Sequence, residues 1–313
     1  MCEQKADRFS GAVIGLALGD AFGAPYEGGF LERALWRAIG WQSGRRRWTD
    51  DTQMTIDVME SLLAYGYVNQ DDLALRFAKS YRWSRGYGPG AARVLKRIRR
   101  GDYWESAARS VYRDGSYGNG GAMRTPAVGL FFAAAPEDEL IAAAAATAAV
   151  THAHPRGREG AVLIALAAAL AYKDRSSEDI IARLCGAVTS PEFLQKLHQA
   201  RNWLETESSV DPREVASKLG NGIAAVESCV TAVYLALAFR SRTFEELLGF
   251  VIGLRGDVDT IAAMACSIWG AARGFGELPR ARLNQLEQYE RLKDLAQALA
   301  ATARKNSQDS VES

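Results

Sequence analysis

Cysteine is scarce in this sequence, with only four in 313 residues. The four lie at positions 2, 185, 229 and 266, without the close spacing of a metal site. Three of them, Cys185, Cys229 and Cys266, fall in apolar helical patterns, which predicts buried thiols. We therefore expect a reducing cytoplasm as the setting, and we do not expect a fold that depends on disulfides.

Charge imbalance and long apolar segments are also missing. The formal net charge is only +1, which gives no overall attraction to nucleic acid or to a membrane surface. The longest clean apolar run, 161–172, is too short to cross a bilayer as a helix. The first five residues lack the apolar stretch of a secretory signal. We therefore expect a cytoplasmic protein without a membrane segment, and one that is monomeric.

A third absence concerns β-structure, since we find no run of alternating β-branched residues. Hydrophobic residues nevertheless make up 48% of the chain, enough for a large globular core. Many apolar residues recur at helical spacing, which predicts helices at 8–18, 52–65, 71–80, 90–99, 137–150, 157–172, 178–188, 191–205, 222–239, 243–254, 260–273 and 283–304. No linker or fixed repeat divides these ranges. The sequence thus predicts one all-α domain over residues 1–305 and a polar, disordered tail at 306–313.

Two short clusters of carboxylates and hydroxyls stand out, far apart in the sequence. One is Thr49-Asp50-Asp51-Thr52 and the other is Asp257-Val258-Asp259-Thr260. Apolar residues follow each cluster at three- and four-residue steps, so each is expected on the first turn of a helix. If the clusters converge, their carboxylates need cations, and oxygen ligands suit Mg²⁺, Mn²⁺ or Ca²⁺ rather than Zn²⁺. The alternative is two unrelated helix caps.

Three more motifs lie between the expected helices. Residues 15–27 leave the first helix through a small-residue turn ending at Glu27, which favours close packing or a ligand contact. Residues 115–124 contain four glycines and could present backbone amides to an anion, but they lack the features of a P-loop. Residues 151–155 hold His152 and His154, which have no suitable partner for zinc, so at least one is expected to be structural.

In order and spacing these motifs resemble the ADP-ribosylglycohydrolase family, over nearly the whole chain from about Gly11 to Gly274. The resemblance implies an all-helical fold with a two-metal cleft, and an enzyme that cleaves ADP-ribose from modified side chains. It also implies two divalent ions, Mg²⁺ or Mn²⁺, an ADP-ribosylated protein as substrate and ADP-ribose as product.

The resemblance further implies roles for individual residues. Two sets of metal ligands correspond to the two clusters: Thr49, Asp50 and Asp51, and Asp257, Asp259 and Thr260. Asp259 would bridge the metals. The carboxylates expected to act in the chemistry are Glu27, Asp51 and Asp257, and the sequence leaves open which of them activates the water. The diphosphate and distal ribose would lie against a glycine-containing loop and one histidine: Ser116, Tyr117, Gly118, Asn119, Gly120, Gly121 and His152.

The second cluster departs from the family's usual Gly-Gly-Asp-Thr-Asp-Thr at two positions. Arg255 and Val258 replace a glycine and a threonine, while every ligand position is kept. The departures therefore bear on substrate preference rather than on metal binding. The expected linkage is N-glycosidic ADP-ribosyl-arginine, because similar compact relatives act on arginine and a protonated guanidine leaves with little acid assistance. The alternative is an O-linked acceptor such as serine, whose departure needs a stronger general acid.

Two functions of other classes stay open. One is a non-catalytic ADP-ribose-binding module, against which the retained Glu27 argues. The other is nucleic-acid binding, suggested by the basic stretches at 45–47 and 93–100. With a net charge near zero, those residues are more readily explained as a solvated face, or as contacts to an acidic protein substrate or to the ligand's phosphates.

Overall fold

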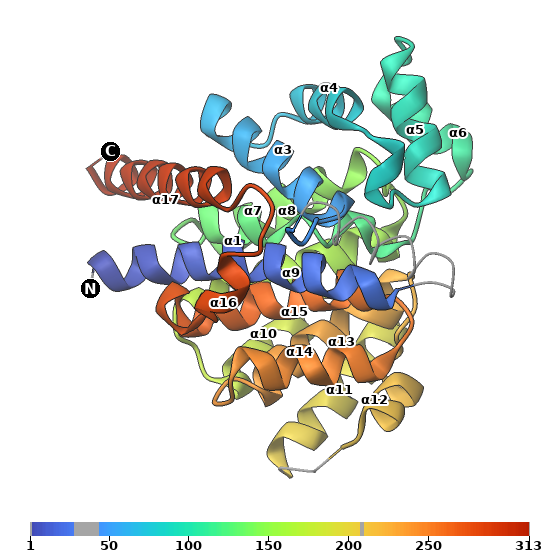
Figure 1. Ribbon diagram of the computed structural model, residues 1–313. Coiled ribbons are helices and arrows are strands. Elements are labelled where there is room, and N and C mark those ends of the chain that lie inside the picture. The colour runs from blue at the N-terminus through green and yellow to red at the C-terminus, as the bar shows by residue number, and fades with distance from the viewer. Residues whose placement is uncertain (1, 28–43, 207–209, 313) are drawn as a thin grey trace.

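Two long helices from opposite ends of the chain, α1 (Cys2–Gly23) and α15 (Val258–Arg273), lie side by side in the computed structural model (Figure 1). The structure describes residues 2–27, 44–206 and 210–312. Every fourth residue of α1 from Gly11 to Gly23 is a glycine that faces α15. A Cβ atom at Gly19 would come within 2.3 Å of the Ala262 carbonyl oxygen, and one at Gly11 within 2.5 Å of the Gly270 carbonyl oxygen. Glycine alone permits this approach, which runs the helices antiparallel.

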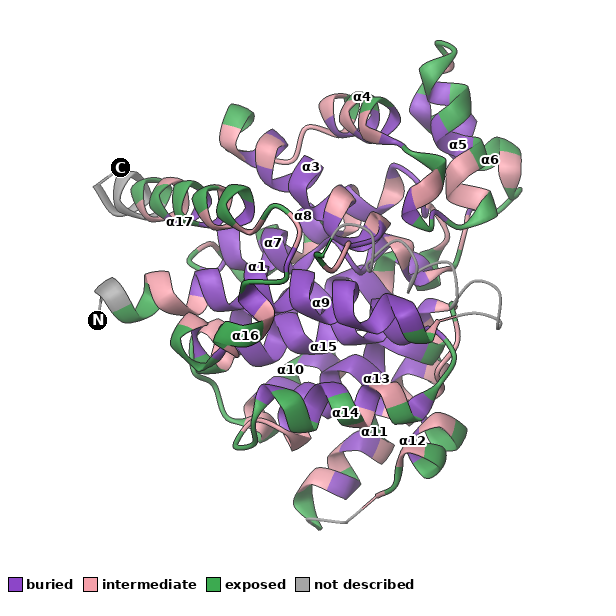
Figure 2. Cartoon of the chain, viewed as in Figure 1, coloured by how far each residue is buried: buried purple, intermediate pink, exposed green. Residues whose placement is uncertain are grey.

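Helices on one side of this pair bury α15 almost completely. Those that pack on α15 directly are α9 (Pro155–Tyr172), α13 (Ala225–Ala238) and α14 (Phe244–Leu254). A further layer consists of α10 (Ser177–Ala187), α11 (Pro191–Glu205) and α12 (Pro212–Lys218). The centre of the hydrophobic core therefore lies around α9 and α15, and Figure 2 shows most residues of these two helices as buried.

A second group of helices lies on the other side of the α1–α15 pair, and it includes α3, which begins at the first carboxylate cluster. It contains α3 (Asp50–Tyr65), α4 (Gln70–Ser80), α5 (Pro89–Arg99), α6 (Trp104–Val111), α7 (Pro126–Phe131) and α8 (Glu137–Ala149). The last helix, α17 (Tyr289–Glu312), returns to pack on α1 and α3. Short connecting helices are η1 (Ala24–Tyr26), η2 (Trp83–Arg85), η3 (Asn119–Gly121), η4 (Phe275–Glu277) and α16 (Arg280–Leu283). No β-strand occurs among the described residues, which confirms the all-α prediction.

Several helix limits differ from the expected ranges. The first helix continues beyond residue 18 to Gly23, because the glycines that predicted a turn serve its packing on α15. Helices α6, α7 and α12 are additional, and they are short, with eight, six and seven residues. The expected helix at 283–304 begins later, with α17 at Tyr289 after Gln288, whose φ is 50°, and only Leu283 of that range lies in α16. Helix α17 extends to Glu312, past the expected end of the domain at residue 305.

The cysteine prediction holds at two of the three positions. Cys229 and Cys266 are buried free thiols, whereas Cys185 is only half-buried on the outer helix α10. Over the described residues, no helix has both the length and the apolar character needed to cross a membrane.

Candidate metal centre

The two predicted clusters lie at the N-termini of α3 and α15, and the fold brings them together. Thr49 is the N-cap of α3; its hydroxyl accepts from the Asp51 amide and donates to Asp51 Oδ2 at 2.9 Å. Asp257 occupies the corresponding position of α15. The hydroxyl of Thr260 lies 3.4 Å from Asp51 Oδ2, which links the clusters directly.

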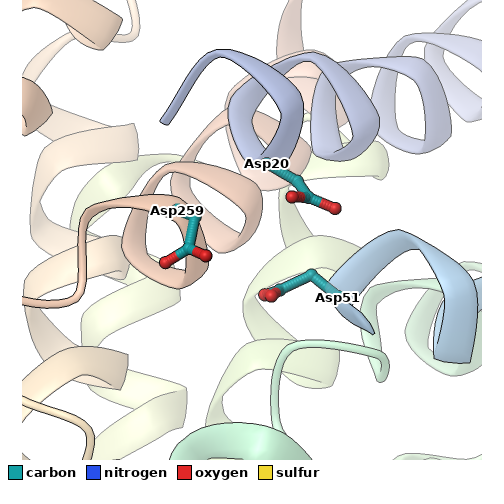
Figure 3. Close-up of side chains that lie close together, drawn as sticks. All are labelled: Asp20, Asp51 and Asp259. Carbon is teal, nitrogen blue, oxygen red and sulfur yellow. The ribbon is translucent and has the colours of Figure 1, made fainter. Parts of the chain in front are cut away.

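Carboxylates from three parts of the chain form two overlapping groups. Asp20, Asp51 and Asp259 each have an oxygen atom within 4.8 Å of the others (Figure 3). Glu27, Asp257 and Asp259 meet the same condition. Asp259 belongs to both groups, and Glu27 is the only one of the five that is not fully buried. Asp50 is half-buried at the start of α3 and belongs to neither group.

Asp20 is a functional residue that the sequence analysis did not single out. It is fully buried and accepts hydrogen bonds from the backbone amides of Thr49 at 2.9 Å and Thr52 at 3.0 Å, and from the Thr52 hydroxyl at 2.5 Å. It therefore orients the first turn of α3 from α1. Asp20 follows Gly19 on the part of α1 that packs closely against α15, beyond the expected end of the first helix at residue 18.

The carboxylates repel one another in a site that is largely buried. Burial, with added repulsion among the carboxylates, raises the pKa of Asp51 and Asp259 well above the usual value. Burial raises the pKa of Asp257 to about 7 and that of Asp20 to about 6. In addition, Asp51 Oδ1 is buried and has no hydrogen-bond partner among the described residues. A divalent cation fits these residues, since it would neutralise the charge and satisfy that oxygen.

The glycine-containing loop lies against the second cluster. The Asn119 side-chain amide donates to Asp257 Oδ2 at 2.5 Å and to the Ser228 hydroxyl at 3.0 Å. The Gly118 amide donates to the Ser116 hydroxyl at 3.3 Å. Asn119 therefore joins the loop to the carboxylates, which places the predicted ligand loop and the predicted metal ligands in one site.

His152 packs under the same loop. A Cβ atom at Gly120 would lie 2.8 Å from His152 Cε1, and one at Gly121 would lie 3.0 Å from the Ala148 Cβ. Burial and the nearby Arg124 lower the pKa of His152 to about 3, so the imidazole is neutral. Its Nδ1 lies 2.8 Å from the Thr151 hydroxyl. Tyr117 is different: it is exposed and contacts the ring of His154 edge-on.

One of the two histidines has a structural role. His154 caps α9 by accepting from the Arg156 amide, so it is structural, as expected of at least one of the pair. Neither histidine belongs to a group of potential metal ligands within the described part of the chain.

A buried arginine supports the loop from below. Arg124 is fully buried and donates to the carbonyl oxygens of Gly120 at 2.7 Å and Thr147 at 2.8 Å, and to the Thr151 hydroxyl at 3.0 Å. Burial lowers its pKa to about 9, so the guanidinium remains charged at neutral pH. It therefore holds both the loop and the residue that contacts His152.

Comparison with known proteins agrees with this arrangement. A model of the ADP-ribosylglycohydrolase family matches residues 1–309. The chain is 34% identical to human "ADP-ribosylhydrolase ARH3", covering 93% of this chain and 92% of that protein. It is 28% identical to the "ADP-ribosyl-[dinitrogen reductase] glycohydrolase" of Rhodospirillum rubrum, covering 90% of each.

A solved structure of an "ADP-ribosylglycohydrolase-related protein complex" has the same fold, with a TM-score of 0.70. It is 25% identical and covers 96% of this chain and 99% of its own. With its sequence matched by the family model almost from end to end, the chain belongs to the ADP-ribosylglycohydrolase family and is a glycosidic-bond hydrolase.

Proposed function

We propose that this protein is a metal-dependent hydrolase that releases ADP-ribose from modified protein side chains. The main support is the position of Asp259, whose carboxylate belongs to both groups of potential ligands. Two divalent ions, Mg²⁺ or Mn²⁺, would be held by the two clusters, with Asp259 shared: Thr49, Asp50 and Asp51, and Asp257, Asp259 and Thr260. When bound, such ions supply Lewis acidity and fix the hydroxyl groups of the sugar.

Glu27 is proposed as the group that exchanges a proton with the reactants. Glycosidic cleavage passes through an oxocarbenium-like state and generally uses carboxylates near the anomeric carbon. Among the clustered carboxylates, Glu27 alone is half-buried, and it follows η1 rather than lying within a long helix. It can therefore reach a substrate that Asp20 and Asp259 cannot. Asp51 and Asp257 are the other proposed catalytic carboxylates.

The ligand's diphosphate and ribose are assigned to the loop of Ser116, Tyr117, Gly118, Asn119, Gly120 and Gly121. Glycines at three of these positions let the loop pack closely on His152 and Ala148, because a Cβ atom at any of them would meet one of those side chains. His152 borders the loop as a neutral ring, so it would contact the ligand through a hydrogen bond rather than through charge.

The linkage has two candidates. N-glycosidic ADP-ribosyl-arginine is supported by the chemistry, since the carboxylates include no additional strong acid and guanidine leaves readily. An O-linked acceptor such as serine is the second candidate, and its departure would need a stronger general acid. Arginine as the acceptor is our primary assignment.

Matched peptides carrying ADP-ribose on arginine, serine or cysteine, assayed with Mg²⁺ and with Mn²⁺, test the proposal. We expect metal-dependent release of ADP-ribose, with the highest kcat/KM for the arginine peptide. A higher kcat/KM for the serine peptide would overturn the arginine assignment and leave the hydrolase intact. Absence of turnover on every peptide in either metal would reject protein de-ADP-ribosylation.

A further inference from the structure

A wide groove lies beside the metal centre, on the face of α3 that carries Asp50. Its volume is about 720 Å³, and its walls come from the segment before α3, from α3 and α4, from the region of η2 and from the start of α17. Asp50, Gln53, Asp57 and Glu60 follow one another at three- and four-residue steps along α3, and the last three line the groove. At 1.5 Å per residue, Gln53 is only about 4.5 Å along the axis from Asp50. The groove therefore begins less than one helical turn along α3 from Asp50, the chain neighbour of Asp51.

The groove holds more positive charge than its own carboxylates neutralise. Glu60 pairs with Arg76 and Arg291, and Asp72 pairs with Arg76. Asp57 is buried and accepts from the Ser80 hydroxyl. The carboxylates of the groove thus already have partners, most of them arginines.

Three cations on the groove walls have no such partner. No carboxylate of the described residues lies within ion-pair distance of Arg47, Lys79 or Arg82. Arg47 donates to the Ser84 hydroxyl, and Arg82 donates to the backbone carbonyls of Lys79 and Tyr81. Lys79 and Arg82 are exposed to solvent. An anionic partner would be attracted to these three side chains.

Exposed apolar side chains accompany the cations. Leu75 lines the groove and is 65% exposed, and Trp83, between Arg82 and Ser84 in the chain, is 82% exposed. These two side chains offer a partner an apolar contact beside the unpaired cations. A small anion would leave both of them in water.

We propose that this groove binds an acidic segment of the acceptor protein, next to the residue that carries ADP-ribose. The inference rests on the proposed function of the metal centre. The stretch of α3 from Gln53 to Glu60 is about 10 Å long, which matches roughly three extended residues of the acceptor. Acidic side chains of that segment would pair with Lys79, Arg82 and Arg47, and an apolar one would cover Leu75 or Trp83.

The test uses ADP-ribosylated peptides with the same modified residue and with acidic, neutral or basic flanking residues. We expect kcat/KM to be about tenfold higher for the acidic peptide than for the neutral one, the effect of a few exposed ion pairs. Lys79→Ala/Arg82→Ala should reduce this preference to about twofold or less, by the same reasoning. The matched control is Arg213→Ala/Lys218→Ala, which removes two exposed charges from α12, at the opposite end of the molecule from α4 (Figure 1).

Binding of the unmodified acidic peptide, followed by fluorescence anisotropy, separates this proposal from the proposed function. Suppose that no peptide is hydrolysed, but that the acidic peptide binds to wild type and to the α12 control and does not bind to Lys79→Ala/Arg82→Ala. The groove proposal would then be supported and the proposed function would be rejected. Equal kcat/KM for all three peptides would overturn it. It would also be overturned by equal losses in the two double variants, or by an oligonucleotide of the same charge binding as tightly as the peptide.

Discussion

Asp20 on α1 accepts a hydrogen bond from the backbone amide of Thr49 at 2.9 Å, so a carboxylate from the first helix orients the first turn of α3. Asp20→Asn should lower Mn²⁺ affinity by about 10- to 100-fold, because an amide has one acceptor oxygen where three donors now converge. The free energy of unfolding should fall by about 1–3 kcal/mol. Isothermal titration with Mn²⁺ and urea unfolding would measure both. Asp294→Asn, an exposed residue of α17, is the control and should change neither.

The second prediction concerns metal content. Wild-type protein saturated with Mn²⁺ should contain two ions per chain, and Asp259→Asn should retain neither, because its carboxylate serves both groups of ligands. Elemental analysis after desalting would measure this. A single zinc ion that disappears in His152→Ala would contradict the all-oxygen centre.

Glu27→Gln separates chemistry from binding. The variant should keep the fold, its metals and most of its affinity for ADP-ribose, since Glu27 is the most accessible of the clustered carboxylates. Its kcat should fall by about 10²- to 10⁴-fold, the usual contribution of a general acid or base. Single-turnover kinetics and ADP-ribose titration would measure the two quantities. Turnover at the wild-type rate would remove Glu27 from the catalytic residues.

Gly120→Ala tests the ligand loop. The new Cβ would lie 2.8 Å from His152 Cε1, so either the loop or the ring must move and ADP-ribose should bind at least about tenfold more weakly. Gly186→Ala is a matched control, because a Cβ at that position meets no atom within 4 Å. Unchanged affinity in Gly120→Ala, with the fold intact by circular dichroism, would show that the ligand binds elsewhere.

The pH dependence of stability should reflect Asp57, a buried carboxyl outside the metal centre. Burial raises its pKa from 3.8 to about 7, so the folded state binds an extra proton between those values. The stabilisation is therefore complete below about pH 4 and is lost as the pH rises toward 7. In saturating Mn²⁺, the free energy of unfolding of wild type should fall over this range relative to Asp57→Asn. Parallel curves for the two proteins, from urea unfolding at several pH values, would contradict the shift.

The residue types and local patterns of the sequence indicate which chemistry the site can support. Thr49-Asp50-Asp51 and Asp257-Val258-Asp259-Thr260 are readable as helix N-termini, because capping residues and the apolar period that follows them are local properties. Their oxygen ligands indicate hard divalent ions without reference to the fold. The order of the motifs was also sufficient to indicate the family, which the comparisons confirm.

Tertiary structure decided which of these residues meet. The sequence predicts that the first helix ends in a turn within residues 15–27, and only the contact with α15 shows that Gly19 and Gly23 belong to a helix. Asp20 is linked to the site by hydrogen bonds from Thr49 and Thr52, which are distant in the chain, so the sequence alone does not show this link. The contacts of Arg124 and His152 with the glycine-containing loop likewise come from the packing of separate segments. The same is true of the groove along α3, whose walls come from several helices. Local periodicity encodes which face of a helix is apolar, but not which helix covers it.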